Sequence, residues 1–189
     1  PPWRGDVVGE ADLVEEVLRV KGFDDIPAVP LARDTVVSRP AIDARRRRAD
    51  LVRRTLAARG LVEAVAFSFI SEKAARAFGG GDPGLRLVNP IAADLSVMRP
   101  SVLPALVEAA QRNADRGFPD LALFELGPLY RDDTPAGQIN AAAGIRSGRT
   151  GPRDWRAKPA APDFILAKSD AIAALAAAGA PADSIQTSA

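Results

Sequence analysis

The chain has 189 residues, of which 47% are hydrophobic, so it is long enough to bury a substantial apolar core. Its 25 Lys and Arg side chains are nearly balanced by 24 Asp and Glu side chains, and the formal net charge is only +1. Such a balance provides no long-range attraction to a membrane surface or a nucleic acid, so any polyanion must be bound by a local group of cations.

The composition also restricts the chemistry that the chain can perform. It contains no cysteine and no histidine, which excludes disulfides, thiol nucleophiles, Cys/His zinc sites and catalysis by imidazole. No apolar run approaches the roughly 20 residues that span a bilayer, and the N-terminus lacks a signal-peptide pattern, so we expect a cytoplasmic protein. The only methionine, Met98, and the opening Pro1-Pro2 predict a domain excised from a longer protein.

The first predicted elements are two helices joined by a linker. A short amphipathic helix is expected from Glu10 to Val20, followed directly by Gly22. Residues 25–39 contain prolines and no periodicity, which is typical of a linker, and we place the domain boundary at residues 31–38. A second helix is expected from Pro40 to Arg59 with Ser38 as its cap. Its apolar stripe is formed by Ile42, Ala49, Val52 and Leu56.

The remaining elements alternate between strands and helices of uneven length. We expect strands at Leu61–Ile70, Leu85–Val88, Ser96–Met98, Asp120–Tyr130 (two segments interrupted at Gly127-Pro128) and Ile139–Arg146. Helices are expected at Ser71–Phe78, Pro104–Ala114 and Ser169–Ala178. The sequence also predicts a surface loop at Gly79–Gly84 and a flexible stretch at Ser147–Pro162. Because no regular βαβ repeat is present, the pattern predicts an α+β fold with an antiparallel sheet flanked by helices.

Four acids near the first helix are candidate metal ligands. Asp12 is spaced three and four residues from Glu15 and Glu16, so these side chains share one side of the helix, and Asp6 precedes it closely. Carboxylate oxygens suit a hard cation such as magnesium. The alternative is that acids gather at the start of a helix because the helix dipole favours them there. The spacing alone leaves both interpretations open.

Several other residues have a structural and a functional interpretation. The run Arg45–Arg48 points in four directions around a helix, which favours a solvated or subunit-contact face over an RNA contact. Arg99 is expected to be a structural anchor that binds buried carbonyl groups or pairs with Glu125. Trp3 and Trp155 are expected to be packing anchors rather than platforms for base stacking.

Segments along nearly the whole chain resemble one known family. The matching segments are Pro2-Trp3-Arg4-Gly5-Asp6, Glu10-Ala11-Asp12-Leu13-Val14-Glu15-Glu16-Val17, Gly22-Phe23-Asp24-Asp25-Ile26-Pro27, Gly60 to Phe69, Asn89-Pro90-Ile91, Ser96-Val97-Met98-Arg99-Pro100-Ser101-Val102-Leu103-Pro104, Asn113, Leu123-Phe124-Glu125-Leu126-Gly127 and Asp163-Phe164. They resemble, in the same order, the β subunit of bacterial phenylalanyl-tRNA synthetases.

The resemblance implies a domain plan and a set of partners. Residues 1–30 are the end of a small domain, residues 31–38 a linker, and residues 39–189 a degenerate, non-catalytic core of the class II aminoacyl-tRNA synthetase type, truncated at its C-terminus. The expected partner is an α subunit, in an (αβ)2 heterotetramer, which binds ATP and carries the aminoacylation site for the tRNA of phenylalanine. The resemblance assigns Asp6, Asp12, Glu15 and Glu16 to a magnesium ion shared with that subunit, and it assigns no catalytic residue to this chain.

The resemblance also pairs the Pro40–Arg59 helix and the following strand with the class II dimerisation motif, and Asp120–Tyr130 with the strand that binds ATP. An adenylating site needs a cation at the α-phosphate, usually an arginine two positions before a glutamate. Leu123 occupies that position before Glu125, so we expect an inactive core. The alternatives are an active ATP-using ligase domain and a free-standing RNA-binding module that uses Arg45–Arg48. The aromatic content of 5% and the near-neutral charge argue against the RNA module.

Overall fold

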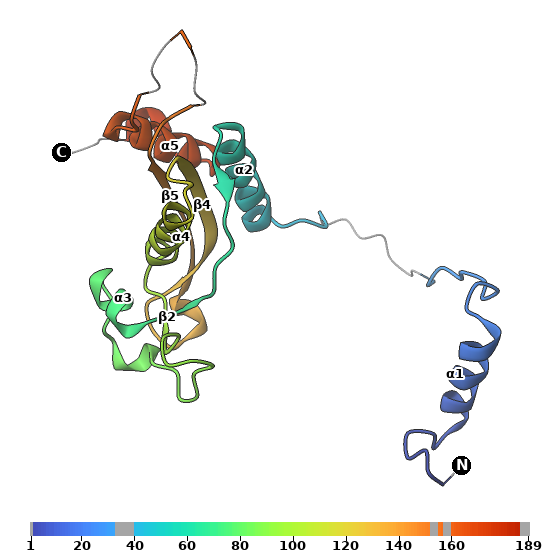
Figure 1. Cartoon of the computed structure of the whole chain (residues 1–189). Coiled ribbons are helices and arrows are strands. Elements are labelled where there is room, and N and C mark those ends of the chain that lie inside the picture. Colours follow the sequence, from blue (N-terminus) through green and yellow to red (C-terminus); the bar gives the residue numbers. More distant parts are fainter. Residues whose placement is uncertain (1, 33–39, 152–154, 157–159, 186–189) are drawn as a thin grey trace. The chain divides into compact units, whose positions relative to one another are not determined.

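The computed structural model describes residues 2–32, 40–151, 155–156 and 160–185 (Figure 1). The chain divides into two compact units, Pro1–Pro40 and Ala41–Ala189. Most of the predicted linker, at residues 31–38, falls outside the described residues, as does the predicted cap Ser38. None of the helices in the described ranges combines the length and the apolar character that crossing a bilayer requires.

The first unit contains the helix α1 (Glu10–Lys21), close to the predicted bounds. Its N-cap is Gly9, and the carboxylate of Asp12, the third helical residue, reaches back to accept hydrogen bonds from the backbone N–H groups of Val8 and Gly9. Its C-terminus is closed by Gly22, which adopts a φ of 105° that residues with a side chain rarely adopt. No residue of α1 is buried, so its order within this unit depends on capping and ion pairs rather than on a core.

The second unit is built on a three-stranded sheet with the order β1-β4-β5. The strand β1 (Val62–Glu63) runs parallel to β4 (Leu121–Tyr130), and β4 runs antiparallel to β5 (Gln138–Ser147) along its whole length. The predicted α+β class is confirmed, but the sheet is mixed rather than antiparallel. The reason is the long connection between β1 and β4, which carries the chain back before the next strand begins.

Helices cover this sheet and form its core. The helices α2 (Ala44–Ala58) and α5 (Phe164–Ala177) contact each other and the sheet, and α4 (Leu103–Asp115) lies against β4 and β5 (Figure 1). The main core consists of buried side chains from α2, from the residue before β1 and from β4. They are Val52, Leu56, Leu61 and Phe124, surrounded by alanines of α5.

A smaller substructure carries a second core. It contains a two-stranded antiparallel ribbon, β2 (Phe69–Ile70) with β3 (Val97–Met98), the helix α3 (Glu72–Ala77) and the 3-10 turn η1 (Pro83–Leu85). Two further 3-10 turns, η2 (Pro135–Gly137) and η3 (Ala182–Ser184), lie outside it. The second core is formed by Ile70, Ala75, Leu85 and Val97, with Tyr130 from the end of β4 packed against it.

Several predicted boundaries were wrong. The helix expected from Pro40 begins at Ala44, because Asp43 caps it by accepting a hydrogen bond from Arg46 N at 2.7 Å. Ile42 therefore precedes the helix and is 57% exposed instead of joining its apolar stripe. Likewise α5 begins at Phe164 rather than Ser169, because the Asp163 carboxylate accepts from Leu166 N at 2.8 Å.

Two strand predictions also need correction. The strand expected from Leu61 to Ile70 is two short strands, β1 and β2, which belong to different sheets. The strand expected from Leu85 to Val88 is the end of η1 followed by one isolated bridge between Arg86 and Val97. Residues 152–154 and 157–159 of the stretch predicted to be flexible lie outside the described residues.

The strand β4 continues through Gly127-Pro128, where an interruption was expected. Tyr130 N donates a hydrogen bond to Arg99 O at 3.0 Å, so the backbone groups of Tyr130 face away from β5. Residues two apart on a strand direct their backbone groups to the same side, so those of Pro128 also face away from β5. The N–H group that proline lacks would have faced away from β5. The ladder between β4 and β5 therefore loses no donor at Pro128.

Candidate functional site

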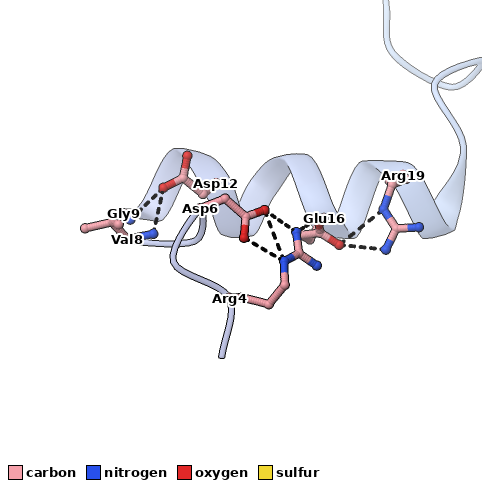
Figure 2. Close-up of polar contacts among 7 residues, drawn as sticks. All are labelled: Arg4, Asp6, Val8, Gly9, Asp12, Glu16 and Arg19. Atoms are coloured by element: carbon pink, nitrogen blue, oxygen red, sulfur yellow. Dashed lines mark hydrogen bonds and ion pairs between the residues drawn. The ribbon is translucent and has the colours of Figure 1, made fainter. Parts of the chain in front are cut away.

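Two of the four predicted metal ligands, Asp6 and Glu16, bind the guanidinium of Arg4, which was not among the predicted site residues. Arg4 Nε donates to Asp6 Oδ1 at 2.8 Å, and Arg4 Nη2 donates to Asp6 Oδ2 at 2.6 Å, which is a bidentate pair. Arg4 Nη2 also reaches Glu16 Oε1 at 2.8 Å (Figure 2). The hydrogen bonds from Arg4 lower the pKa of Asp6 to about 2. Asp6 is therefore ionised at neutral pH and already has a cationic partner.

Glu16 is occupied on both of its oxygens. Oε1 accepts from Arg4, and Oε2 accepts from Arg19 Nη2 at 2.7 Å, one turn further along α1. Hydrogen bonds from Arg19 and Arg4, in that order of size, hold the pKa of Glu16 below its usual value. In Figure 2 the side chains of Arg4 and Arg19 approach the Glu16 carboxylate from different sides. Glu16 is thus the centre of a small ion-pair network on the helix surface.

The other two acids do not join this network. Asp12 Oδ2 accepts from Gly9 N at 2.8 Å and from Val8 N at 2.9 Å, and these backbone hydrogen bonds lower its pKa. The Glu15 side chain is exposed and forms no hydrogen bond or ion pair with another described residue. Adjacent helical positions diverge by about 100°, so Glu15 cannot share the direction of Glu16.

In this arrangement the four acids do not fit a divalent ion. Within the described ranges, no three Asp, Glu, His or Cys side chains are grouped closely enough to hold a metal. Asp6 and Glu16 converge on the guanidinium of Arg4, and Asp12 is directed to the backbone at the helix start (Figure 2). Magnesium binding by Asp6, Asp12, Glu15 and Glu16 stays a prediction, and it requires Arg4 to move.

A second polar cluster lies inside the larger unit, where Arg99 and Glu125 are 1% and 3% exposed. Arg99 Nη1 donates to Glu125 Oε1 at 2.7 Å, and Arg99 Nε donates to Pro128 O at 2.8 Å. The backbone of Arg99 also bonds to Ser68 O and Tyr130 N. The prediction that Arg99 is a structural anchor paired with Glu125 is confirmed. One residue thus connects the segment before β2 with the end of β4.

Gly127 is part of this arrangement because the guanidinium lies directly against it. A Cβ atom at residue 127 would lie 2.5 Å from Arg99 Nη2 and 3.2 Å from Glu125 Oε1. A side chain at residue 127 would therefore force the buried guanidinium of Arg99 to shift, although the φ of Gly127 is ordinary.

The cluster bears directly on nucleotide binding. Glu125 and Leu123 alternate with Phe124 along β4 and so lie on the same face of the sheet. The Glu125 carboxylate on that face is enclosed and paired with Arg99, so it is not available to a ligand in solvent. Arg131 and Asp133, an arginine with an acid two positions later that was not among the predicted candidates, lie exposed in the turn after β4.

A third cluster was not predicted at all. Asp170 on α5 accepts hydrogen bonds from Arg59 Nε and Arg146 Nε, each at 2.7 Å, and Arg146 Nη2 also donates to Arg59 O. Burial acts to raise the pKa of Asp170, but its partners Arg146 and Arg59 outweigh burial and lower that pKa below 3.8. The partners are 111 and 24 residues away in the chain, so no local pattern could have revealed the network.

Other candidate residues are on the surface. Within Arg45–Arg48, Arg46 pairs with Asp50 at 3.1 Å, as a solvated helix face would. Trp3 and Trp155 were expected to be packing anchors, and this was wrong, because they are 82% and 91% exposed. Trp3 belongs to the first unit, whose helix buries none of its residues.

Residues 26–189 match the family described as "Phenylalanyl tRNA synthetase beta chain CLM domain". The chain belongs to this family. It is 54% identical over 186 residues to the "Phenylalanine--tRNA ligase beta subunit" of Paramagnetospirillum magneticum, with 98% of this chain and 23% of the relative covered. It is 53% identical over 190 residues to the protein of the same name from Brucella abortus, with 98% and 24% covered. The chain therefore spans about a quarter of the length of these relatives of the synthetase β-chain family.

Solved structures support the fold of this synthetase β-chain family member. Pyrrolysyl-tRNA synthetase from Desulfitobacterium hafniense superposes with a TM-score of 0.50 at 18% identity, covering 71% of this chain and 47% of that one. At this identity the likeness concerns the fold alone.

Proposed function

We propose that the chain is a non-catalytic core within the β subunit of a phenylalanine–tRNA ligase and that it scaffolds the α subunit of that enzyme. The support is the family match together with more than 50% identity to β subunits over 98% of the chain. The proposal places the reaction, which joins phenylalanine to its tRNA with ATP, on the α subunit of a cytoplasmic (αβ)2 heterotetramer. Residues 1–30 and 39–189 would be the end of a small domain and the class II core.

The observation that carries the non-catalytic role is the burial of Glu125 against Arg99. Transfer of an adenylate requires cations directed at the phosphates, because negative charge develops there in the transition state. On the corresponding face of β4, the cation present is Arg99, which is enclosed, and Leu123 provides no charge. A nucleotide approaching this face would find no exposed arginine beside Glu125.

The surface proposed for the α subunit is the edge formed by β1 and the segment that follows it. Among the described strands, none pairs with the outer side of β1, so its backbone groups there are free for another chain. Three large apolar side chains beside this edge, Val62, Val65 and Phe67, are strongly exposed. Exposed apolar side chains next to an open strand edge favour a protein interface. An obligate contact of this kind would bury more than about 2,000 Å².

Phenylalanine-dependent ATP–pyrophosphate exchange tests the non-catalytic role. We expect the purified chain to give no exchange above a blank without protein. Exchange that survives repurification would contradict the proposal. The variant Arg131→Ala would then show whether the exposed arginine after β4 provides the missing cation. Loss of exchange in Arg131→Ala would favour the alternative of an active ATP-using ligase domain.

A further inference from the structure

A hollow of about 490 Å³ lies between the helices α2 and α5 and the strands β4 and β5. The two helices contact each other on one face of the sheet (Figure 1). Most of the side chains that α5 and β5 contribute to the lining are alanines, namely Ala171, Ala174, Ala178, Ala141 and Ala142. Short side chains on facing elements leave space that larger side chains would fill. The hollow is therefore a consequence of the alanine-rich sequences of α5 and β5.

Two arginines without partners stand at the exposed part of this lining. The side chains of Arg45 and Arg48 are exposed, and neither forms an ion pair or a hydrogen bond with another described residue. They are three residues apart on α2 and lie on the same side of the helix as Val52, which also lines the hollow. Their neighbour Arg46, by contrast, is paired with Asp50. Two like charges at this spacing repel each other, so an anion held between them would stabilise the helix.

The combination suits a small ligand with an apolar body and a carboxylate group. The volume lies within the range of small-molecule sites, and such sites are mostly apolar with a few polar groups that orient the ligand. Guanidinium groups one helical turn apart offer planar N–H donors to the two oxygens of a carboxylate. The exposed amide of Asn140 provides a further donor in the lining. None of the described residues that line the hollow is acidic, so no neighbouring carboxylate repels an anion there.

We propose that the hollow between α2 and α5 binds small aromatic carboxylates, with the ring against the alanines and the carboxylate between Arg45 and Arg48. The binding depends on these side chains alone and holds whether or not the chain scaffolds another subunit. The apolar body excludes water from the alanine lining, and the arginines select the sign of the charge. A molecule with the same ring and a positive charge keeps the apolar contact but is repelled by both guanidinium groups.

The first test compares two ligands on the wild-type 189-residue chain and needs no substitution. The chain is isotope-labelled and titrated with naphthoate or with naphthylmethylammonium, which carry the same ring and opposite charges, while the backbone amide resonances are followed by NMR. We expect naphthoate to shift the resonances of Ala142 and Ala174 with a dissociation constant of about 1 mM or lower, and the ammonium ligand to bind at least about tenfold more weakly. Equal affinities, shifts centred on other residues, or no binding of naphthoate would each overturn the proposal.

The second test uses two double variants with the same change in charge. Arg45→Gln/Arg48→Gln removes both cations of the hollow and should weaken naphthoate binding at least about tenfold. The matched control is Arg47→Gln/Arg54→Gln, because these exposed arginines also lie on α2 and do not line the hollow, and it should change the affinity less than about twofold. An equal loss in both double variants would show that only the net charge of the helix attracts the ligand and would contradict the proposal.

A third variant fills the hollow without altering its charge. Ala171 is exposed in the lining, so Ala171→Leu should occupy part of the space while the Tm of the chain stays within about 2 °C of the wild type. We expect naphthoate to bind Ala171→Leu at least about tenfold more weakly than the wild type. Unchanged affinity in a folded Ala171→Leu chain would place the ligand elsewhere and would overturn the proposal.

Discussion

The substitution Arg99→Met probes the buried pair on which the folded core depends. It preserves much of the volume of the arginine side chain but leaves the Glu125 carboxylate, 3% exposed, without its cation. Breaking a buried pair from one side typically costs about 3–5 kcal/mol, because the remaining charge is desolvated and uncompensated. The site supports the upper part of that range. Glu125 Oε2 has no hydrogen-bond partner among the described residues even with Arg99 present.

The assay is urea unfolding followed by circular dichroism, with thermal unfolding as a second probe. A loss of about 3–5 kcal/mol corresponds to a fall in Tm of roughly 6–20 °C for a unit of this size. The double variant Arg99→Met/Glu125→Leu removes both charges. It should recover most of the loss, because replacing a whole buried pair by apolar side chains is often neutral. The exposed pair of Arg76 with Glu72 provides the control, and Arg76→Met should cost less than about 1 kcal/mol.

Two results would refute this reasoning. One is a cost for Arg99→Met as small as that for Arg76→Met, which would mean that the buried pair contributes no more than a surface pair. The other is a double variant whose loss equals the sum of the two single losses. That would show that the charges of Arg99 and Glu125 are not coupled.

Two further predictions concern the interior of the larger unit. Gly127→Ala should destabilise the chain by about 1–3 kcal/mol in urea unfolding, because the new Cβ would lie 2.5 Å from Arg99 Nη2. The control is Gly151→Ala, whose new Cβ would meet no atom within 4 Å, and it should change the free energy of unfolding by no more than about 0.5 kcal/mol. Asp170→Asn should cost about 1–3 kcal/mol near pH 7, and equal stability of Asp170→Asn and wild type there would contradict it. Because the folded pKa of Asp170 is lowered below 3.8, its contribution is complete above that unfolded value and is lost as pH falls through the folded pKa. The difference between wild type and Asp170→Asn should therefore shrink below about pH 4, and a constant difference down to pH 2 would show that the carboxylate charge is not involved.

Local patterns predicted the presence of most elements but not their ends. The helix α1 and the ribbon strand β3 follow from apolar spacing and from Gly22, which are local signals. The start of α2 was placed at Pro40 because of its proline, and that of α5 at Ser169 because of the alanines that follow. The caps that set the actual starts are Asp43 and Asp163. Competing caps within a few residues differ by only about 1 kcal/mol, so sequence alone cannot rank them.

A contact between distant segments was predicted only where a buried side chain had few possible partners. Arg99 lies between apolar segments, and burying an arginine requires an acid or carbonyl partner, so its pairing with Glu125 could be anticipated. Arg4 could not be recognised, because its role depends on how the chain before α1 folds back toward Glu16. Asp170 depends on the meeting of α2, β5 and α5, which only the tertiary structure determines.

Assembly with the cognate α subunit tests the scaffolding role most directly. Val65 is 90% exposed beside the open edge of β1, so Val65→Lys should leave the Tm of the chain within about 2 °C of the wild type. If this edge contacts the α subunit, a buried lysine should raise the dissociation constant at least about tenfold, measured by sedimentation of the 189-residue chain with the α subunit. Val88→Lys is the matched control, since Val88 is also exposed but lies away from β1 in the sequence. The account predicts binding by the wild type and by Val88→Lys and weakened binding by Val65→Lys. Absence of binding by the wild type, or identical binding by all three proteins, would contradict it.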